Sequence, residues 1–489
     1  MKLRMLMGGL LAATVLVACA GSSGSSSGGG SGSATGGGTG ATGGGSAGGG
    51  SAMPGTVVDV AAGNPDFSSL VAAVQKAGLA TTLADTSKQY TVFAPTNAAF
   101  AALLTKLGAP NLDALSAEQL KPILLYHVLG SKVDAAAATT AAQGNQKVSA
   151  LGGKIQLSLQ GTTIRLDAKA SVTAADVAAS NGVIHVIDQV ILPSALDIVS
   201  TDARFSSLAA AVAKADTATP SPGFLATLDD DGLATKVTVF APTNDGFTAL
   251  VSALKGSDDG AKTGITALGD FRADQLVPVI AYHVIGSPVF AKDVPASGQV
   301  DTLGGKVAVT RSGTTVTVDA VPVAVADIVA SNAVIHAVGS VLLPSITDIV
   351  TTSPRFTALK GAVVAADGAS GTTPKVAGAL DGSSTFTLFA PTNAAFTALG
   401  TAPTGQDLTN VLLYHAAPGA PVYAATALAL TSPLTVSTAF SGKSFAVNAE
   451  GAPKGVTVAD STATKAKVTD VNYFAANGVI HAIDKVLIP

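Results

Sequence analysis

The chain has 489 residues, enough for roughly three domains of ordinary size, and 47% of them are hydrophobic. Only 12% are charged, the net charge is −4, and no cluster of Lys and Arg occurs, which argues against a nucleic-acid partner held through its phosphates. The single cysteine excludes both a disulfide framework and a cysteine-based metal site. The surface must therefore consist largely of small neutral side chains, which suits contact with uncharged partners.

The first 19 residues are typical of a secretory signal. Lys2 and Arg4 precede an apolar run that ends in small residues, and this run is too short to span a bilayer as a helix. The string "LVAC" ends at Cys19, the only cysteine, and resembles a bacterial lipobox, in which the cysteine becomes acylated after cleavage. An ordinary signal peptide is the alternative. Because Ala20 rather than Asp follows, the resemblance favours the outer membrane if the host is Gram-negative.

Residues 20–55 consist almost entirely of Gly, Ser, Ala and Thr. Such a segment cannot bury a core and is predicted to be a flexible tether with a reach of roughly 30–35 Å. Beyond it we expect no transmembrane helix. The longest uncharged stretch, 408–442, is interrupted by Pro and Gly and is expected to form loops and strands of a folded domain.

The rest of the chain repeats one unit. "TVFAPTNAAF" (91–100) recurs at 238–247 and 387–396, at a spacing of roughly 150 residues, which is the size of a domain. Each unit then closes with a VIH segment and "ILP", "LLP" or "LIP". We therefore predict three tandem domains at 56–193, 194–344 and 345–489. Near the start of each domain we predict the start of a helix at an Asp residue, to which we assign no ligand role: Asp59, Asp197 and Asp348.

Within a unit, helical and strand patterns alternate. In the first unit, apolar spacing predicts a helix in "DFSSLVAAV", a strand in "YTVFAP", and a helix after it with Thr96 or Asn97 as the N-cap. "LKPILLYHVL" passes from helix to extended chain, and "GGKIQLSLQGTTIRLDA" is a hairpin turning at Gln160-Gly161. A turn at Asn181-Gly182 leads into the final strand. The unit is an α+β domain.

All six histidines fall at two positions of the repeat. The first position follows a tyrosine, as Tyr126-His127, Tyr282-His283 and Tyr414-His415, and the second lies in the VIH segment, as His185, His336 and His481. One interpretation is structural, because a buried imidazole must find hydrogen-bond partners. A second is a binding surface anchored by the tyrosine ring. A third is catalysis or metal binding.

The third interpretation lacks supporting residues. No GxSxG, HExxH or phosphate-loop motif occurs, and no acidic residue recurs as a third metal ligand or as an orienting partner. We therefore predict no catalytic residue, no metal and no cofactor. Triplication also favours binding over catalysis, because tandem copies strengthen binding through avidity.

The ordered combination of "TVFAPTNAAF", "LLYHV" and "NGVIHVIDQVILP" resembles the fasciclin (FAS1) domain family, and all three copies carry it, over about residues 56–489. The resemblance implies a wedge-shaped β-sandwich with packed helices. It also implies extracellular or cell-surface work, mostly adhesion and matrix binding, without a cofactor or a general enzymatic activity.

In animal members of the family, the Tyr-His segment and an Asp-Ile pair before the NGVIH turn are linked to integrin binding. Asp327-Ile328 matches that pair, Asp176-Val177 matches it approximately, and the third copy has Asn472-Tyr473 with Asp470 displaced by two. A bacterium has no integrins, so these matches support the fold more than a ligand.

Two further departures distinguish the copies. The second has Asn332-Ala333 where the others have Asn-Gly, and because Ala is disfavoured at positive φ we expect a different turn there. The third replaces "GGK" by "SGK", which predicts different packing or a lost ligand.

These observations predict a secreted, lipid-anchored cell-surface protein that mediates adhesion or contacts matrix protein or polysaccharide through non-catalytic domains. The membrane is contacted through the N-terminal anchor, and nucleic acid is not a partner. Two alternatives are an envelope-organising protein–protein interaction module and a module that binds a small molecule or pigment.

Overall fold

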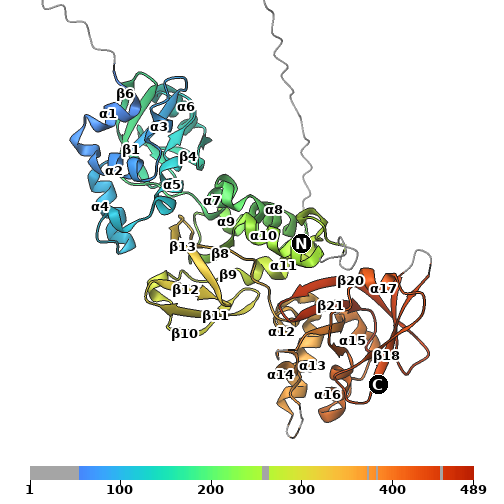
Figure 1. Cartoon of the computed structure of the whole chain (residues 1–489). Helices are drawn as coiled ribbons and strands as arrows, with labels where there is room; N and C mark the ends of the chain where they lie inside the picture. The colour runs from blue at the N-terminus through green and yellow to red at the C-terminus, as the bar shows by residue number, and fades with distance from the viewer. Residues whose placement is uncertain (1–53, 256–263, 370, 372–373, 382–383, 452–454) are drawn as a thin grey trace, which may run out of the picture. The chain divides into compact units, whose positions relative to one another are not determined.

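The computed structural model describes residues 54–489 except 256–263, 370, 372–373, 382–383 and 452–454. The described part contains three consecutive α+β domains (Figure 1), which we call the first (56–193), second (194–344) and third (345–489) domain. The predicted fold class is confirmed. Cys19, the signal segment and nearly all of the predicted tether lie outside the described residues.

The first domain closes its strands into a barrel. The sheet runs in the order β2-β1-β7-β6-β5-β4-β3, and pairing of Leu129 with Ala150 joins β2 to β3. The central pair, β1 and β7, is parallel. Its helices are α1 (Val57–Ala62), α2 (Ser68–Lys76), α3 (Ala80–Leu83), α4 (Asn97–Leu107), α5 (Ala117–Tyr126) and α6 (Ala135–Gln143). Its strands are β1 (Tyr90–Pro95), β2 (Val128–Leu129), β3 (Lys147–Ala150), β4 (Gly153–Gln160), β5 (Thr163–Leu166), β6 (Ala170–Ala179) and β7 (Gly182–Ile187).

The second domain repeats this topology as a seven-stranded sheet with β14 parallel to β8. Its helices are α7 (Ala195–Thr201), α8 (Ser206–Ala215), α9 (Phe224–Asp229), α10 (Asn244–Lys255) and α11 (Ala273–Tyr282). Its strands are β8 (Val237–Pro242), β9 (Val284–Ile285), β10 (Ser297–Thr302), β11 (Gly305–Ser312), β12 (Thr315–Val318), β13 (Val321–Val329) and β14 (Ala333–Val338).

The third domain has the same order, with β21 parallel to β15. Its helices are α12 (Ile346–Thr352), α13 (Thr357–Gly368), α14 (Val376–Leu380), α15 (Asn393–Leu399), α16 (Gly405–Tyr414) and α17 (Ala424–Leu428). Its strands are β15 (Phe386–Pro391), β16 (Ala416–Pro418), β17 (Leu434–Ser437), β18 (Ser444–Glu450), β19 (Gly455–Ala459), β20 (Ala466–Ala475) and β21 (Gly478–Ile483).

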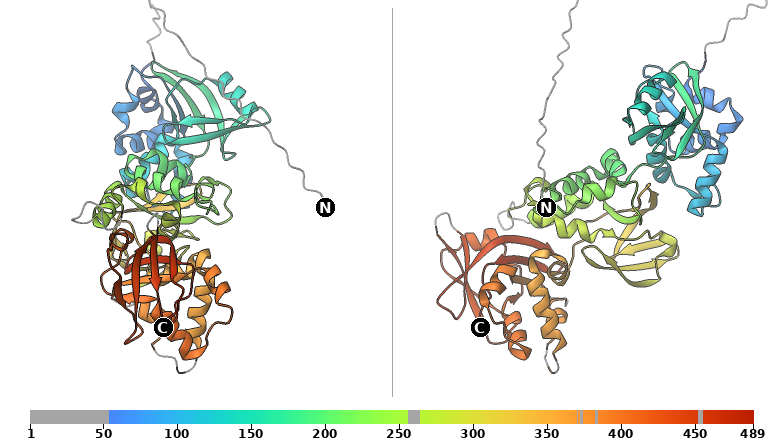
Figure 2. Two further views of the ribbon diagram at one scale, coloured as in Figure 1. Left: turned by 90° about the vertical axis from the view of Figure 1, so that its right-hand side faces the viewer. Right: turned by 180° about the vertical axis from the view of Figure 1, so that it is seen from behind.

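The FAPTN strand separates two cores in every domain. In β1, Val92 and Ala94 face a core formed with α1, α2 and α5, whereas Phe93 faces a core inside the barrel. Figure 2 shows the amino-terminal helices of the first domain gathered on one side of its strands. A strand buried on both faces carries a continuous apolar run, which explains why "YTVFAP" contains no charge.

The uncharged stretch 408–442 holds more helix than we predicted. It includes most of α16 and all of α17, besides β16 and β17. The prediction of loops and strands was therefore wrong in part, because Pro421 and Pro433 fall between elements, where they end no helix. Within the described residues, no helix combines the length and apolarity needed to cross a bilayer.

The turn before the last strand differs between copies as predicted. Gly478 has a φ of 149°, and a Cβ there would lie 1.9 Å from the carbonyl oxygen of Phe386. Ala333 has no positive φ, and its carbonyl oxygen accepts a hydrogen bond from the N–H of Ala330 at 2.9 Å. In the "GGK" copies, a Cβ on Gly152 would lie 2.5 Å from the main-chain nitrogen of Tyr126, so the serine of "SGK" requires a locally different packing.

Candidate functional site

The Tyr-His position ties a helix end to the last segment of the domain. His127 is the C-cap of α5, and its Nδ1 lies 2.7 Å from the carbonyl oxygen of Ile123, one turn back in the same helix. Its Nε2 accepts the N–H of Ile191 at 3.2 Å. The ring is therefore the Nδ1–H tautomer, with both nitrogens bonded to main chain.

The same two bonds occur in the other domains. His283 contacts the Val279 carbonyl oxygen at 2.7 Å and the Leu342 N–H at 2.9 Å. His415 contacts the Val411 carbonyl oxygen at 2.7 Å and the Leu487 N–H at 2.8 Å. Burial of the ring lowers the pKa of each of these histidines to about 4, so all three are neutral at pH 7.

The tyrosines of these pairs point into the domains. Tyr126 is fully buried in the barrel core, and its hydroxyl lies 3.0 Å from both the Lys154 carbonyl oxygen and the Asp167 carboxylate. Burial raises the pKa of Asp167 to about 6. Tyr282 and Tyr414 are likewise buried, bonded to the carbonyl oxygens of Lys306 and Ser444. None of the three rings is exposed to a partner, so the geometry favours the structural interpretation.

The second histidine position holds a β-bulge in place. His185 receives the N–H of Asp176 on Nδ1 at 3.3 Å, and its Nε2 lies 2.9 Å from the Val133 carbonyl oxygen. This ring is the opposite, Nε2–H, tautomer. His336 and His481 repeat the pattern with Asp327 and Asn472. Because both nitrogens of all six rings are taken by main-chain groups, none is available as a general base or as a metal ligand.

The bulge residue has a left-handed backbone conformation in each domain. Asp176, Asp327 and Asn472 have φ values of 58°, 56° and 58°. Each side-chain oxygen accepts a main-chain N–H, those of Ala135, Ala291 and Ala424. Ile328, which completes the Asp-Ile pair, is fully buried. The bulge therefore offers main-chain carbonyl oxygens, rather than the Ile side chain, to its surroundings.

The second and third domains use their bulges to receive the preceding domain. Gln119, at the third position of α5, accepts the N–H of its own N-cap Ser116 on Oε1, and its Nε2 donates to the carbonyl oxygens of Ala326 and Asp327 at 2.9 and 3.3 Å. Gln275 in α11 repeats this, with its Nε2 2.8 Å from the Asn472 carbonyl oxygen. The capping bond orients the amide so that its NH₂ group faces the next domain.

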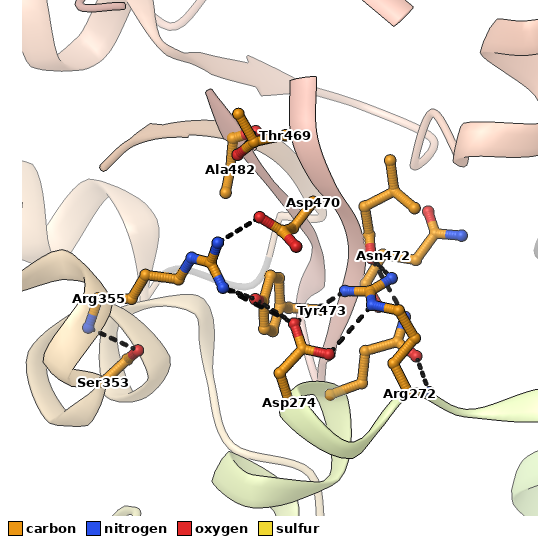
Figure 3. Close-up of polar contacts among 11 residues, drawn as sticks. Arg272, Asp274, Ser353, Arg355, Thr469, Asp470, Asn472, Tyr473 and Ala482 are labelled. Atoms are coloured by element: carbon orange, nitrogen blue, oxygen red, sulfur yellow. Dashed lines mark hydrogen bonds and ion pairs between the residues drawn. The ribbon is translucent and has the colours of Figure 1, made fainter. Parts of the chain in front are cut away.

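Charged groups strengthen the joint between the second and third domains (Figure 3). Arg272 donates to the Val471 carbonyl oxygen at 2.8 Å, and Tyr473 donates to Asp274 at 2.6 Å. Although burial alone would raise the pKa of Asp274, hydrogen bonds from Arg272 and Tyr473 hold it below its usual value. Arg355, which pairs with Asp470, also lies 3.9 Å from Asp274.

A second contact completes each joint. The N–H of Lys154 donates to Asp197 at 3.1 Å, and the N–H of Lys306 donates to Asp348 at 3.2 Å. A Cβ on Gly153 would lie 2.4 Å from Asp197, so this approach requires glycine. Burial raises the pKa of Asp197 and Asp348. Both are also capping-box residues of the helices that open their domains, as is the exposed Asp59.

Sequence reasoning missed one repeated residue. Asn181, predicted as part of a turn, is fully buried, and its side chain bonds the Val57 N–H at 2.8 Å and the Leu83 carbonyl oxygen at 2.8 Å. Asn332 and Asn477 do the same in their domains. The signal was the retention of Asn in all three copies while the glycine after it changed to alanine in the second.

Replacing Asn181 by alanine is expected to destabilise the first domain by about 2–4 kcal/mol, because it leaves a buried N–H and a buried carbonyl without partners. Peptide-resolved hydrogen exchange of the full chain measures this, with the second and third domains as internal controls. Unchanged protection of α1 and β7 would contradict the assignment.

Each of the three domains matches a known protein family. The fasciclin-domain family model matches residues 65–193, 203–344 and 361–489. The chain therefore belongs to the fasciclin-domain family.

Individual relatives cover different shares of the chain. Protein sll1483 of Synechocystis sp. is 46% identical over 138 residues, which are 28% of this chain and 73% of that protein. Transforming growth factor-beta-induced protein ig-h3 of Sus scrofa is 30% identical over 294 residues, 59% of this chain and 38% of that protein. The solved FAS1 domain pair of the insect cell adhesion molecule Fasciclin I is 16% identical with a TM-score of 0.27, covering 57% of this chain and 96% of that one.

Proposed function

We propose that the protein is a secreted, lipid-anchored cell-surface protein that mediates adhesion or contacts matrix protein or polysaccharide. The observation that carries the proposal is a tandem array of domains whose buried histidines, tyrosines and asparagines are all engaged internally. Contacts with a partner are therefore made by the outer surface, which has few charges. Three copies of the domain increase the avidity of such contacts. Acylation of Cys19 would supply the anchor. Membership of the fasciclin-domain family supports the same function.

The test immobilises the full chain carrying Cys19→Ser, which is purified without acyl chains, and measures retention of cells and of envelope polysaccharide. We expect saturable retention that changes little between about 0.05 and 0.5 M salt, because a weakly charged surface is little affected by screening. Heat-unfolded protein is the control. Retention equal to that control, or retention abolished by salt, would reject adhesion. Tyr126→Ala is unsuitable as a binding test, because that ring is buried and its loss reports on folding.

Small-molecule binding is a second candidate, favoured by one cleft. A cleft of about 770 Å³ lies beside the joint of the second and third domains, with Val277, Leu303 and Arg355 in its lining. This volume is typical of small-molecule sites, whereas an apolar cavity next to His127 measures only about 30 Å³. Leu303, a half-exposed side chain, is the residue to change. Saturable uptake of an apolar dye that is lost in Leu303→Asp would favour this candidate, and uptake unaffected by the substitution would reject it.

A further inference from the structure

The two joints share a pattern that the bulge of the first domain and the helix α16 of the third domain lack. We call the helix that docks on the next domain the giving side of a joint, and the bulge that it docks on the receiving side. On the giving side, the third residue of the helix is a glutamine, Gln119 or Gln275. The equivalent residue of α16, eight before the Tyr-His histidine, is Asp407. Asp407 is exposed. A carboxylate cannot donate a hydrogen bond, and it would face carbonyl oxygens that are also acceptors.

The receiving side differs in a matching way. Beside its bulge, the second domain carries Phe290 and Val329, which lie in one apolar cluster with Leu103 and Ile123 of the first domain. The third domain carries Tyr423 and Phe474 there, and Phe474 packs edge-on against Phe271 of the second domain at 5.7 Å.

At the equivalent positions of the first domain lie Asp134, seven residues after its histidine, and Ala178, seven before His185. Both are exposed, as is the bulge residue Asp176. The uncovered bulge is therefore flanked by one carboxylate and one small alanine instead of two larger apolar side chains.

We infer that these positions determine which fasciclin domain docks on which, and that their replacement in α16 and beside the bulge of the first domain prevents head-to-tail joining of two copies. Docking α16 of one chain on the bulge of another would bring Asp407 towards Asp134 and Asp176. Like charges repel there, no donor reaches the carbonyl oxygens, and no aromatic side chain is buried. Without these replacements, α16 of one copy would dock on the first-domain bulge of the next copy. This contact joins two different surfaces, so successive copies would join into open chains.

Transplanting the joint residues tests the inference. A giving variant carries Pro403→Phe, Thr404→Arg and Asp407→Gln, which copy Phe271, Arg272 and Gln275. A receiving variant carries Asp134→Tyr and Ala178→Phe, which copy Tyr423 and Phe474. Sedimentation at up to about 1 mM, comparable to the effective concentration that a short linker provides, should show each variant alone as a monomer and their mixture as a one-to-one complex.

A substitution inside the chain provides the loss experiment. Gln275→Asp places the third-domain residue in an existing joint and should raise hydrogen exchange at 470–476 at least tenfold, while Gln406→Asp, an exposed change in α16, should not. A mixture that stays monomeric, association of the wild-type chain through α16 and β6, or association of either variant alone would each overturn the inference. Unchanged exchange in Gln275→Asp would overturn the role of the glutamine.

Discussion

Replacing His127 with alanine is expected to destabilise the first domain by about 3–5 kcal/mol and to lower its melting temperature by about 10 °C or more. The ring carries two buried main-chain bonds, to the Ile123 carbonyl oxygen and the Ile191 N–H. The helix cannot replace the first bond, because the N–H of His127 bonds Leu124 and not Ile123. A loss of this size is a large part of the stability of an ordinary domain.

The measurement is a urea titration of the full chain followed by peptide-resolved hydrogen exchange, which assigns each transition to a domain. Lys132→Ala, an exposed change in the loop after β2, is the matched control and should change stability by less than about 0.5 kcal/mol. His283→Ala and His415→Ala should reproduce the loss in their own domains. A shift below about 1 kcal/mol in all three would refute the bracing role.

Much of the fold could be predicted because its signals are local. The capping residue Thr96, the strand in "YTVFAP" and the hairpin at Gly161 each depend on a few neighbouring residues, and the structure confirms them, although that strand is buried on both faces rather than alternating. Because the unit is repeated, an element predicted in one copy could also be predicted in the other two. The stretch 408–442 was harder, because helices as short as α17 have too few residues to show a period.

The site could be predicted only in part, because its partners are distant in sequence. The need of a buried imidazole for partners was evident, but Ile191 lies 64 residues from His127. The joint glutamines were invisible for another reason. Gln119 fits the ordinary pattern of a capping residue at a helix start. Only the packing of the domains shows that its side-chain Nε2 donates to the carbonyl oxygens of residues 326 and 327.

The third domain is expected to lose more stability in acid than the first. In the folded third domain, burial lowers the pKa of His415 and His481 to about 4, below the value of about 6.5 expected after unfolding. The unfolded chain therefore binds more protons between these values. The contribution is complete above about pH 6.5 and falls as the pH drops towards 4, by about 3 kcal/mol for each ring. The raised pKa of Asp348 offsets part of this loss.

The first domain contains a carboxyl group whose raised pKa opposes the loss of stability in acid more strongly than that of Asp348 does. His127 behaves like His415, but burial raises the pKa of Asp167 to about 6, above its usual value of 3.8. A raised carboxyl pKa means that the folded state holds the proton more tightly, so stability increases as the pH falls from 6 towards 4. This gain of about 3 kcal/mol roughly cancels the loss at His127 over the same window.

Hydrogen exchange of the full chain at pH 7.5 and 4.5, corrected for intrinsic rates, should therefore show protection lost in β15–β21 before β1–β7. Asp167→Asn removes the opposing group and keeps the acceptor for the Gln156 N–H. Because the neutral amide resembles the protonated acid, this variant should be more stable than wild type at pH 7.5. It should also acquire an acid sensitivity closer to that of the third domain, whereas Asp188→Asn, a change at an exposed residue of the same domain, should not. Equal loss of protection in both domains of the wild-type chain would show that the buried rings do not set its response to acid.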